Sequence, residues 1–270
     1  MGKEWQVDIA KTKWPENIEG IVIGDEGCIY RSLDLRWISW VERALNRNVA
    51  LRYLTPPVPN KNVEELFNYI VNLTTLTTPK VSFNDFGMLY RCQELIKRKK
   101  IIPVLGRIIT RSILDCPWYK ELLKNENPEL ITAITGSNFV HRSKWEVLRQ
   151  FDIDEIELNI TNNKDASHLK EMGFRLTYYK SNILVSVGRI CYSARWQGLE
   201  LPKCCNNHSC RTELIIEIDK KWGKQKLMFE DPVESVKEKY QNLFVKGNIV
   251  FKYPRENLNI PEALFNNIII

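Results

Sequence analysis

The chain lacks any apolar run close to the roughly 18–20 residues that a membrane-spanning helix needs. Its first residues, Met1 to Trp5, have no apolar core of the kind found in a secretory signal. Gly2 is not followed by the serine or threonine of a myristoylation site. We therefore expect a cytoplasmic protein without a membrane span.

Several signatures of common enzyme classes are also missing. The chain contains no Gly-rich nucleotide-binding loop, no serine-nucleophile elbow and no His-Glu-x-x-His motif. With 12 glycines and 12 prolines among 270 residues, of which 44% are hydrophobic, it is neither collagen-like nor disordered. A chain of this length buries enough surface to fold without disulfide bonds.

The chain has only a small excess of positive charge. The 39 basic and 33 acidic residues give a net charge of +6. The densest basic run, Lys97 to Lys100, directly precedes the apolar stretch Ile101–Leu105, as at the end of a helix that leads into a strand. No ladder of interleaved aromatic and basic residues accompanies it, so we do not expect a nucleic-acid partner.

Seven cysteines are the most informative part of the composition. In a chain without an export signal we interpret them as thiols rather than disulfides. Cys204, Cys205 and Cys210 share one short polar segment with His208, and Cys191 lies just upstream. Loop thiols without a packing role are typical of a metal site.

Two other cysteines have different surroundings. Cys92 lies in the helical pattern Met88–Ile96, where we expect it to pack as a small hydrophobic residue. Cys116 stands before Pro117 and Trp118, and the sequence leaves its role open.

Short apolar runs alternate with amphipathic patterns along most of the chain. We expect strands over Ile18–Ile23, Val49–Tyr53, Lys80–Phe83, Ile101–Leu105, Glu155–Ile160, Arg175–Tyr179 and Ile183–Val187. We expect helices over Leu33–Leu45, Val63–Leu73, Gly87–Lys97, Arg142–Phe151 and Ala166–Met172. The tail after Arg211 is less regular, with strands over Glu213–Ile218 and Gly247–Tyr253 and helices over Val233–Leu243 and Pro261–Asn267.

Repeated strand–helix units predict an α/β fold, either a (β/α) TIM-like barrel or a doubly wound sheet. We favour the barrel, complete or distorted, because no Gly-rich fingerprint follows the first strand. The cysteine-rich loop and the irregular C-terminal extension are expected as additions to it. No repeat or linker is evident, so residues 1–270 are expected to form a single barrel domain.

Polar side chains follow the ends of several expected strands. Asp25 and Glu26, with Cys28, come after the first strand, Asn84 and Asp85 come after the third, and Arg31 and Arg195 lie near strand ends as well. The side chains after parallel strands converge at one end of a barrel, where a carboxylate can act as acid or base and an arginine can bind an anion. Alternatively, the first acidic pair shapes a turn and the second caps a helix.

Three segments carry a family resemblance. Gly24-Asp25-Glu26-Gly27-Cys28-Ile29-Tyr30-Arg31, Ser82-Phe83-Asn84-Asp85-Phe86-Gly87 and Tyr192-Ser193-Ala194-Arg195 occur in this order, and the cysteine-rich segment follows. Together they resemble the collagenase-like peptidase family, in particular its UbiU/UbiV iron–sulfur members. The resemblance covers about 70% of the chain, from Ile18 to Cys210.

The resemblance implies a (β/α) barrel that carries a 4Fe-4S cluster held by four cysteines. Carried over by position, the ligands are Cys28, Cys191 and two from the Cys204–Cys210 segment, with Cys205 and Cys210 as the expected late pair. The sequence leaves open whether Cys204 or Cys205 binds and whether His208 replaces a thiolate. The resemblance also implies oxygen-independent hydroxylation, as in ubiquinone biosynthesis, or a related oxygen- or sulfur-atom transfer, with a homologous UbiU-like or other protein subunit and a small-molecule substrate.

Two alternatives remain open at this stage. The same cluster could serve an enzyme that modifies RNA or a peptide. Zinc is the competing metal, because four cysteines, or three with His208, also satisfy a tetrahedral zinc site. A zinc-stabilised scaffold subunit without enzymatic activity would then be expected. The resemblance, together with the absence of paired Cys-x-x-Cys knuckles, favours iron and sulfur over zinc.

Overall fold

The structure is a computed structural model that describes residues 1–9, 13–116, 119–135, 142–159, 163–188, 191–196, 214–215, 243–254 and 262–270. The chain separates into two compact units. The first comprises residues 1–111, 137–181 and 259–270, and the second comprises residues 112–136 and 182–258. The expectation of a single domain stays a prediction.

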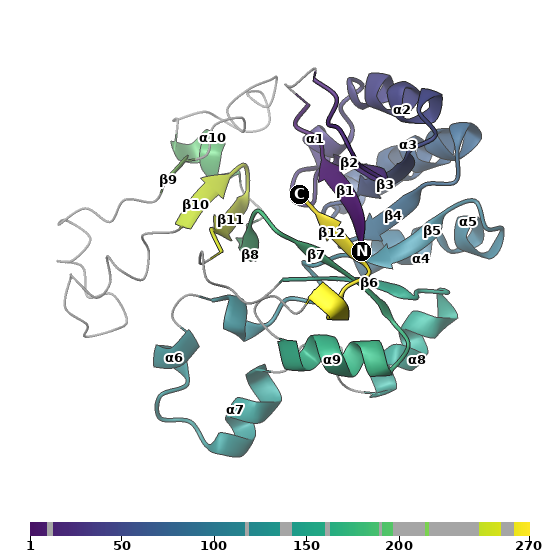
Figure 1. Ribbon diagram of the computed structural model, residues 1–270. Coiled ribbons are helices and arrows are strands. Elements are labelled where there is room, and N and C mark those ends of the chain that lie inside the picture. Colours follow the sequence, from purple (N-terminus) through teal and green to yellow (C-terminus); the bar gives the residue numbers. More distant parts are fainter. Residues whose placement is uncertain are drawn as a thin grey trace. The chain divides into compact units, whose positions relative to one another are not determined.

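Eight strands of the first unit form a closed barrel with the order β1-β12-β7-β6-β5-β4-β3-β2 (Figure 1). Every neighbouring pair is parallel. The strands are β1 (Gly2–Gln6), β2 (Gly20–Gly24), β3 (Ala50–Leu54), β4 (Lys80–Phe83), β5 (Ile102–Leu105), β6 (Glu155–Leu158), β7 (Arg175–Tyr179) and β12 (Asn267–Ile269). The predicted TIM-like barrel is therefore confirmed.

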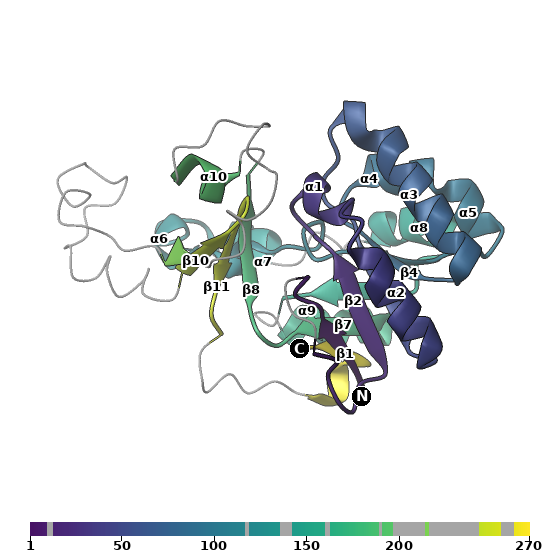
Figure 2. The same ribbon diagram turned by 90° about the horizontal axis from the view of Figure 1, so that it is seen from above.

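Helices follow the strands and cover the outside of the barrel. They are α1 (Ile29–Ser32), α2 (Trp37–Asn46), α3 (Val63–Leu76), α4 (Phe86–Arg91), α5 (Gln93–Lys97), α8 (Arg142–Gln150) and α9 (Asn163–Glu171). Viewed from above, α2, α3 and α5 follow one another around the outside (Figure 2). In α2 the residues Trp37, Trp40, Val41 and Ala44 are buried, which is the spacing of one helix face turned toward a sheet.

The strand predictions inside the chain are accurate to about two residues, because each strand is a compact apolar run between turn signals. The two strands that close the barrel were not predicted. β1 pairs with β2 and β12, and β12 also pairs with β7. The helix expected over Pro261–Asn267 is wrong, because only a short 3-10 helix (η4, Glu262–Leu264) forms there and Asn267 already begins β12. Tertiary pairing outweighs local propensity in such a short segment.

The second unit contains a four-stranded antiparallel sheet with the order β8-β11-β10-β9. Its strands are β8 (Ile183–Val187), β9 (Leu214–Ile215), β10 (Leu243–Lys246) and β11 (Ile249–Lys252). Its helical elements are the 3-10 helix η2 (Ile113–Asp115), α6 (Tyr119–Leu122), α7 (Pro128–Thr135) and α10 (Tyr192–Trp196). The helix expected over Val233–Leu243 lies almost wholly outside the described residues, and its last residue belongs to β10.

Candidate functional site

The loop after β2 is held closed by the carboxylate of Asp25. Its Oδ1 accepts hydrogen bonds from the backbone N–H groups of Gly27 (2.9 Å) and Cys28 (2.7 Å), and its Oδ2 lies 3.3 Å from Nε of Arg31. The Ser32 hydroxyl donates to the backbone oxygen of Asp25 at 2.8 Å. Asp25 therefore shapes the turn that carries Cys28, which is the second of the two interpretations open from the sequence.

Gly24 makes this turn possible. Its φ is +85°, a left-handed conformation that favours glycine, and a Cβ there would lie 2.6 Å from the backbone oxygen of Leu54. The chain can therefore leave β2 sharply and pass close to the end of β3.

The loop after β4 is fixed by two neighbouring polar residues with different tasks. Asn84 is buried, and its amide donates to the backbone oxygen of Thr55 (3.0 Å) and accepts from the backbone N–H of Ile108 (3.0 Å). It therefore ties together the loops that follow β3, β4 and β5. Asp85 caps α4, because its Oδ1 accepts from the N–H of Met88 at 2.9 Å.

Glu26 meets a partner that the sequence did not indicate. Arg107, which follows β5, is fully buried and forms a two-pronged ion pair with Glu26, with Nε–Oε2 at 2.8 Å. Its guanidinium also lies over the ring of Tyr179, 3.6 Å from the ring centroid. Burial acts to lower the pKa of Arg107, but Glu26 outweighs it and the pKa lies above its usual value.

A second buried arginine occupies the barrel interior. Arg52 on β3 contacts Glu4 on β1 and both Glu155 and Glu157 on β6, and its Nη1 lies 2.9 Å from Oε1 of Glu157. Lys80 on β4 adds contacts to Glu4 (3.2 Å) and Glu155 (3.0 Å). The alternating pattern Glu155-Ile156-Glu157-Leu158 was the available signal, because it turns the two carboxylates to the same face of the strand.

The described cysteines fall into distinct environments, and none of them forms a disulfide. Cys92 is fully buried, and burial raises the pKa of its thiol to about 12, which confirms its role as a core residue. Cys28 is partly exposed in the loop after β2, and Cys116 is also partly exposed. Cys191 is buried, and its Sγ accepts from the backbone N–H of Ala194 at 3.4 Å.

The remaining predicted ligands, Cys204, Cys205, Cys210 and His208, lie outside the described residues. Within the part of the chain that is described, no group of three or more His, Cys, Asp or Glu side chains is arranged to hold a metal ion. Cys28 belongs to the first unit and Cys191 to the second.

Arg195 lies on α10 in the second unit, where it is exposed. The same helix is anchored by Ser193, whose backbone N–H donates to the oxygen of Gly247 (3.0 Å) and whose hydroxyl accepts from the N–H of Gly247 (2.9 Å). Arg195 is thus displayed on a fixed element.

The structure brings five of the predicted residues to one end of the barrel. Cys28, Asp25 and Glu26 follow β2, and Asn84 and Asp85 follow β4, so all five lie at the carboxyl end of parallel strands. Asp25, Asn84 and Asp85 bind backbone groups, and Glu26 binds Arg107. Their contacts hold the loops in place, and their catalytic roles stay predictions.

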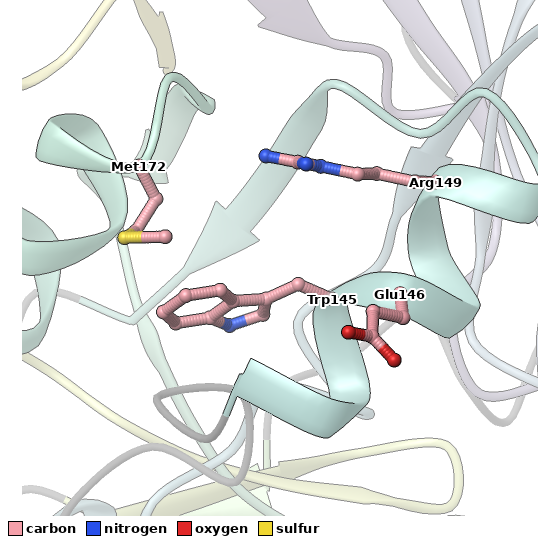
Figure 3. Close-up of a pocket in the computed structure, with 4 residues that line it drawn as sticks. All are labelled: Trp145, Glu146, Arg149 and Met172. Carbon is pink, nitrogen blue, oxygen red and sulfur yellow. The ribbon is translucent and has the colours of Figure 1, made fainter.

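A pocket of about 350 Å³ is lined by residues of α8 and by the residue that follows α9. Trp145, Glu146, Arg149 and Met172 line it. Figure 3 shows Trp145 and Arg149 extending toward Met172, while the carboxylate of Glu146 points away from Met172. The Trp145 ring also packs on His168 of α9, with 5.6 Å between ring centroids.

None of the helices in the described ranges is long and apolar enough to cross a bilayer. Comparisons of the chain with protein-family models, with curated proteins and with solved structures gave no match.

Proposed function

We propose that this chain is an iron–sulfur protein similar to the UbiU/UbiV proteins. In this proposal it acts in oxygen-independent hydroxylation, or in a related oxygen- or sulfur-atom transfer, together with a protein partner. The observation that carries the proposal is the position of Cys28. It is a thiol in a loop fixed by Asp25 at the carboxyl end of a closed parallel barrel, whereas Cys92 is packed in the core.

The donor chemistry fits the proposed group. Cys28 and Cys191 are thiols outside any disulfide, and soft thiolates are the usual ligands of iron–sulfur clusters. Cys205 and Cys210 complete the proposed ligand set, with Cys204 as the alternative to Cys205. When bound, a cluster of this kind supplies one-electron redox chemistry.

The residues of the chain itself would hold and shield such a site. Asp25 fixes the backbone of Cys28, so that the thiol is presented from a rigid loop. Asn84 keeps the neighbouring loops together, and the Arg107–Glu26 pair fills the end of the barrel with groups that satisfy each other. In this proposal Arg195 binds an anionic group of the substrate.

The first test is metal analysis on protein purified without oxygen. We expect about four irons and four sulfides per chain and an electron paramagnetic resonance signal after chemical reduction. Cys28→Ala and Cys191→Ala should lose most of the iron and keep their circular dichroism spectrum. Cys116→Ala is the matched control, because Cys116 is also partly exposed but lies outside the proposed ligand set, and it should keep its iron.

Zinc without sulfide would contradict the proposal. Full iron content in Cys28→Ala would contradict the ligand set, because the loop thiol would then be dispensable.

A further inference from the structure

Three buried glutamates of the barrel interior share their cations unevenly. Arg52 and Lys80 face three glutamates, Glu4, Glu155 and Glu157, and each of these glutamates is at most 5% exposed. Arg175, which is 43% exposed and also pairs with Asp154, lies 3.5 Å from Glu155. The Arg107–Glu26 pair is neutral by itself. Glu157 contacts Arg52, which Glu4 and Glu155 also contact, so an ionised Glu157 is costly in a medium of low dielectric constant.

Two of the glutamates are matched in position but not in surroundings. Glu155 and Glu157 are both fully buried on β6, two residues apart. Glu155 contacts Arg52, Lys80 (3.0 Å) and Arg175 (3.5 Å), and accepts from the Thr177 hydroxyl at 2.8 Å. Glu155 therefore has the surroundings of an ionised carboxylate.

Glu157 is bound by two hydroxyl groups and by one shared cation. Its Oε1 is bonded to the Ser82 hydroxyl and lies 2.9 Å from Arg52, and its Oε2 accepts from the Tyr179 hydroxyl at 3.0 Å. The Arg52 charge is shared with two other glutamates. Two hydroxyl groups can bind a carboxylic acid or a carboxylate equally well, because each hydroxyl can donate or accept a hydrogen bond.

A cluster of fully buried side chains lies at the carboxyl end of the interior. Val22, Leu54, Tyr179 and Ile269 form one buried cluster, and the last three end their strands. Water therefore has little access from this side to compensate an extra charge on Glu157.

We propose that Glu157 holds a proton in the folded barrel at neutral pH, and that release of this proton at alkaline pH weakens the barrel. Glu157 thus acts as a pH-sensitive element of the fold. The proposal does not depend on the iron–sulfur function. The charged and titratable groups around Glu157 come from the neighbouring strands and from two loops: Glu4, Arg52, Lys80, Glu155, Tyr179, Glu26 and Arg107.

The direction of the pKa shifts agrees with this assignment. Burial raises the pKa of Glu157, and Arg52 and Ser82 offset this only in part, with Glu26 adding a repulsion. In Glu155 burial also acts to raise the pKa, but Arg52 and Lys80 lower it to about 2. Since the folded state holds the Glu157 proton more tightly than the unfolded state does, stability falls as pH rises from 4.5 through the raised folded pKa.

Infrared spectroscopy of the native protein gives the direct test. We expect the stretching band of a protonated carboxyl group at about pH 7, shifted by labelling glutamate with ¹³C and absent from Glu157→Gln. Glu155→Gln is the matched control and should keep the band if it folds. A native protein without this band would overturn the proposal, whatever the stability of the variants.

Denaturant unfolding provides the second readout. Glu157→Gln should unfold at the same or a higher denaturant concentration than native protein at about pH 7, and it should lose less stability at alkaline pH. Glu155→Gln should unfold at a clearly lower concentration, or fail to fold, because it leaves two cations with fewer partners. Equal losses of stability in Glu157→Gln and Glu155→Gln would contradict the proposal.

Discussion

Buried ion pairs make particular residues sensitive to substitution. Arg107 and Glu26 are both nearly inaccessible and belong to loops that are 81 residues apart in the sequence. Replacing Arg107 with Met would leave the Glu26 carboxylate buried without its cation. We expect a loss of about 3–5 kcal/mol in the free energy of unfolding, measured by chemical denaturation.

The double variant Arg107→Met/Glu26→Gln separates this effect from lost packing. Because neither charge remains, it should be clearly more stable than Arg107→Met alone. Additive losses in the double variant would show that the ion pair is not the cause.

At the same scale, the lowered pKa of Glu155 predicts that the folded protein loses stability in acid. Its pKa is lowered from 4.5 to about 2 in the folded barrel. Its contribution is therefore fully present above pH 4.5 and is lost as pH falls toward 2. The loss should reach up to about 3 kcal/mol.

Urea unfolding measured across this pH range checks the prediction. Relative to native protein, Glu155→Gln should show a flatter decline between pH 4.5 and 2. An unchanged decline would assign the acid sensitivity to other carboxylates.

At the scale of elements, two glycines end their segments in the same backbone conformation but in different surroundings. Gly24 after β2 has φ +85° and Gly173 after α9 has φ +88°. A Cβ on Gly24 would meet the Leu54 backbone oxygen at 2.6 Å, whereas nothing lies within 4 Å of a Cβ on Gly173. Replacing each glycine with alanine therefore separates the cost of backbone strain, which both positions share, from the cost of steric conflict, which arises only at Gly24.

Gly173→Ala should cost about 1 kcal/mol, since only the strained φ contributes. Gly24→Ala should cost about 1–3 kcal/mol more, because the backbone of β3 has to move. Thermal unfolding of both variants measures the difference. Equal losses would mean that the turn after β2 adapts without cost.

At the scale of the whole molecule, barrel closure depends on a short C-terminal strand. β12 is hydrogen-bonded to β1 on one side and to β7 on the other. Removal of residues 262–270 would leave both neighbours with unpaired strand edges and would remove Ile269 from the buried cluster. We expect the truncated chain to lose cooperative unfolding and to aggregate, as judged by circular dichroism and size-exclusion chromatography.

Ile270→Asp is the control for this experiment. Ile270 follows β12 and is 39% exposed, so the full-length variant should keep the native melting behaviour within a few degrees. Cooperative unfolding of the truncated chain would show that the barrel does not need its eighth strand.

Local patterns in the sequence were sufficient for the central part of the fold. Compact apolar runs predict β4, β7 and β8 with their observed bounds, and helical spacing predicts α2, α3 and α8 closely. The position of Asp25, Asn84 and Cys28 at strand ends followed from the same patterns. The cysteine-rich segment lies outside the described residues, so its predicted role is unchanged.

The tertiary structure decided what depends on pairing across long distances in the chain. β1 and β12 are short, and only their mutual pairing between β2 and β7 makes them strands. The carboxylate partners of Arg52 are 48, 103 and 105 residues away, and no local pattern specifies them. Sequence periodicity by itself determined the strands from β2 to β8, because it reflects burial of one face. Barrel closure and the pairing of the buried charges were decided only by the fold, because both require groups that meet in space and not along the chain.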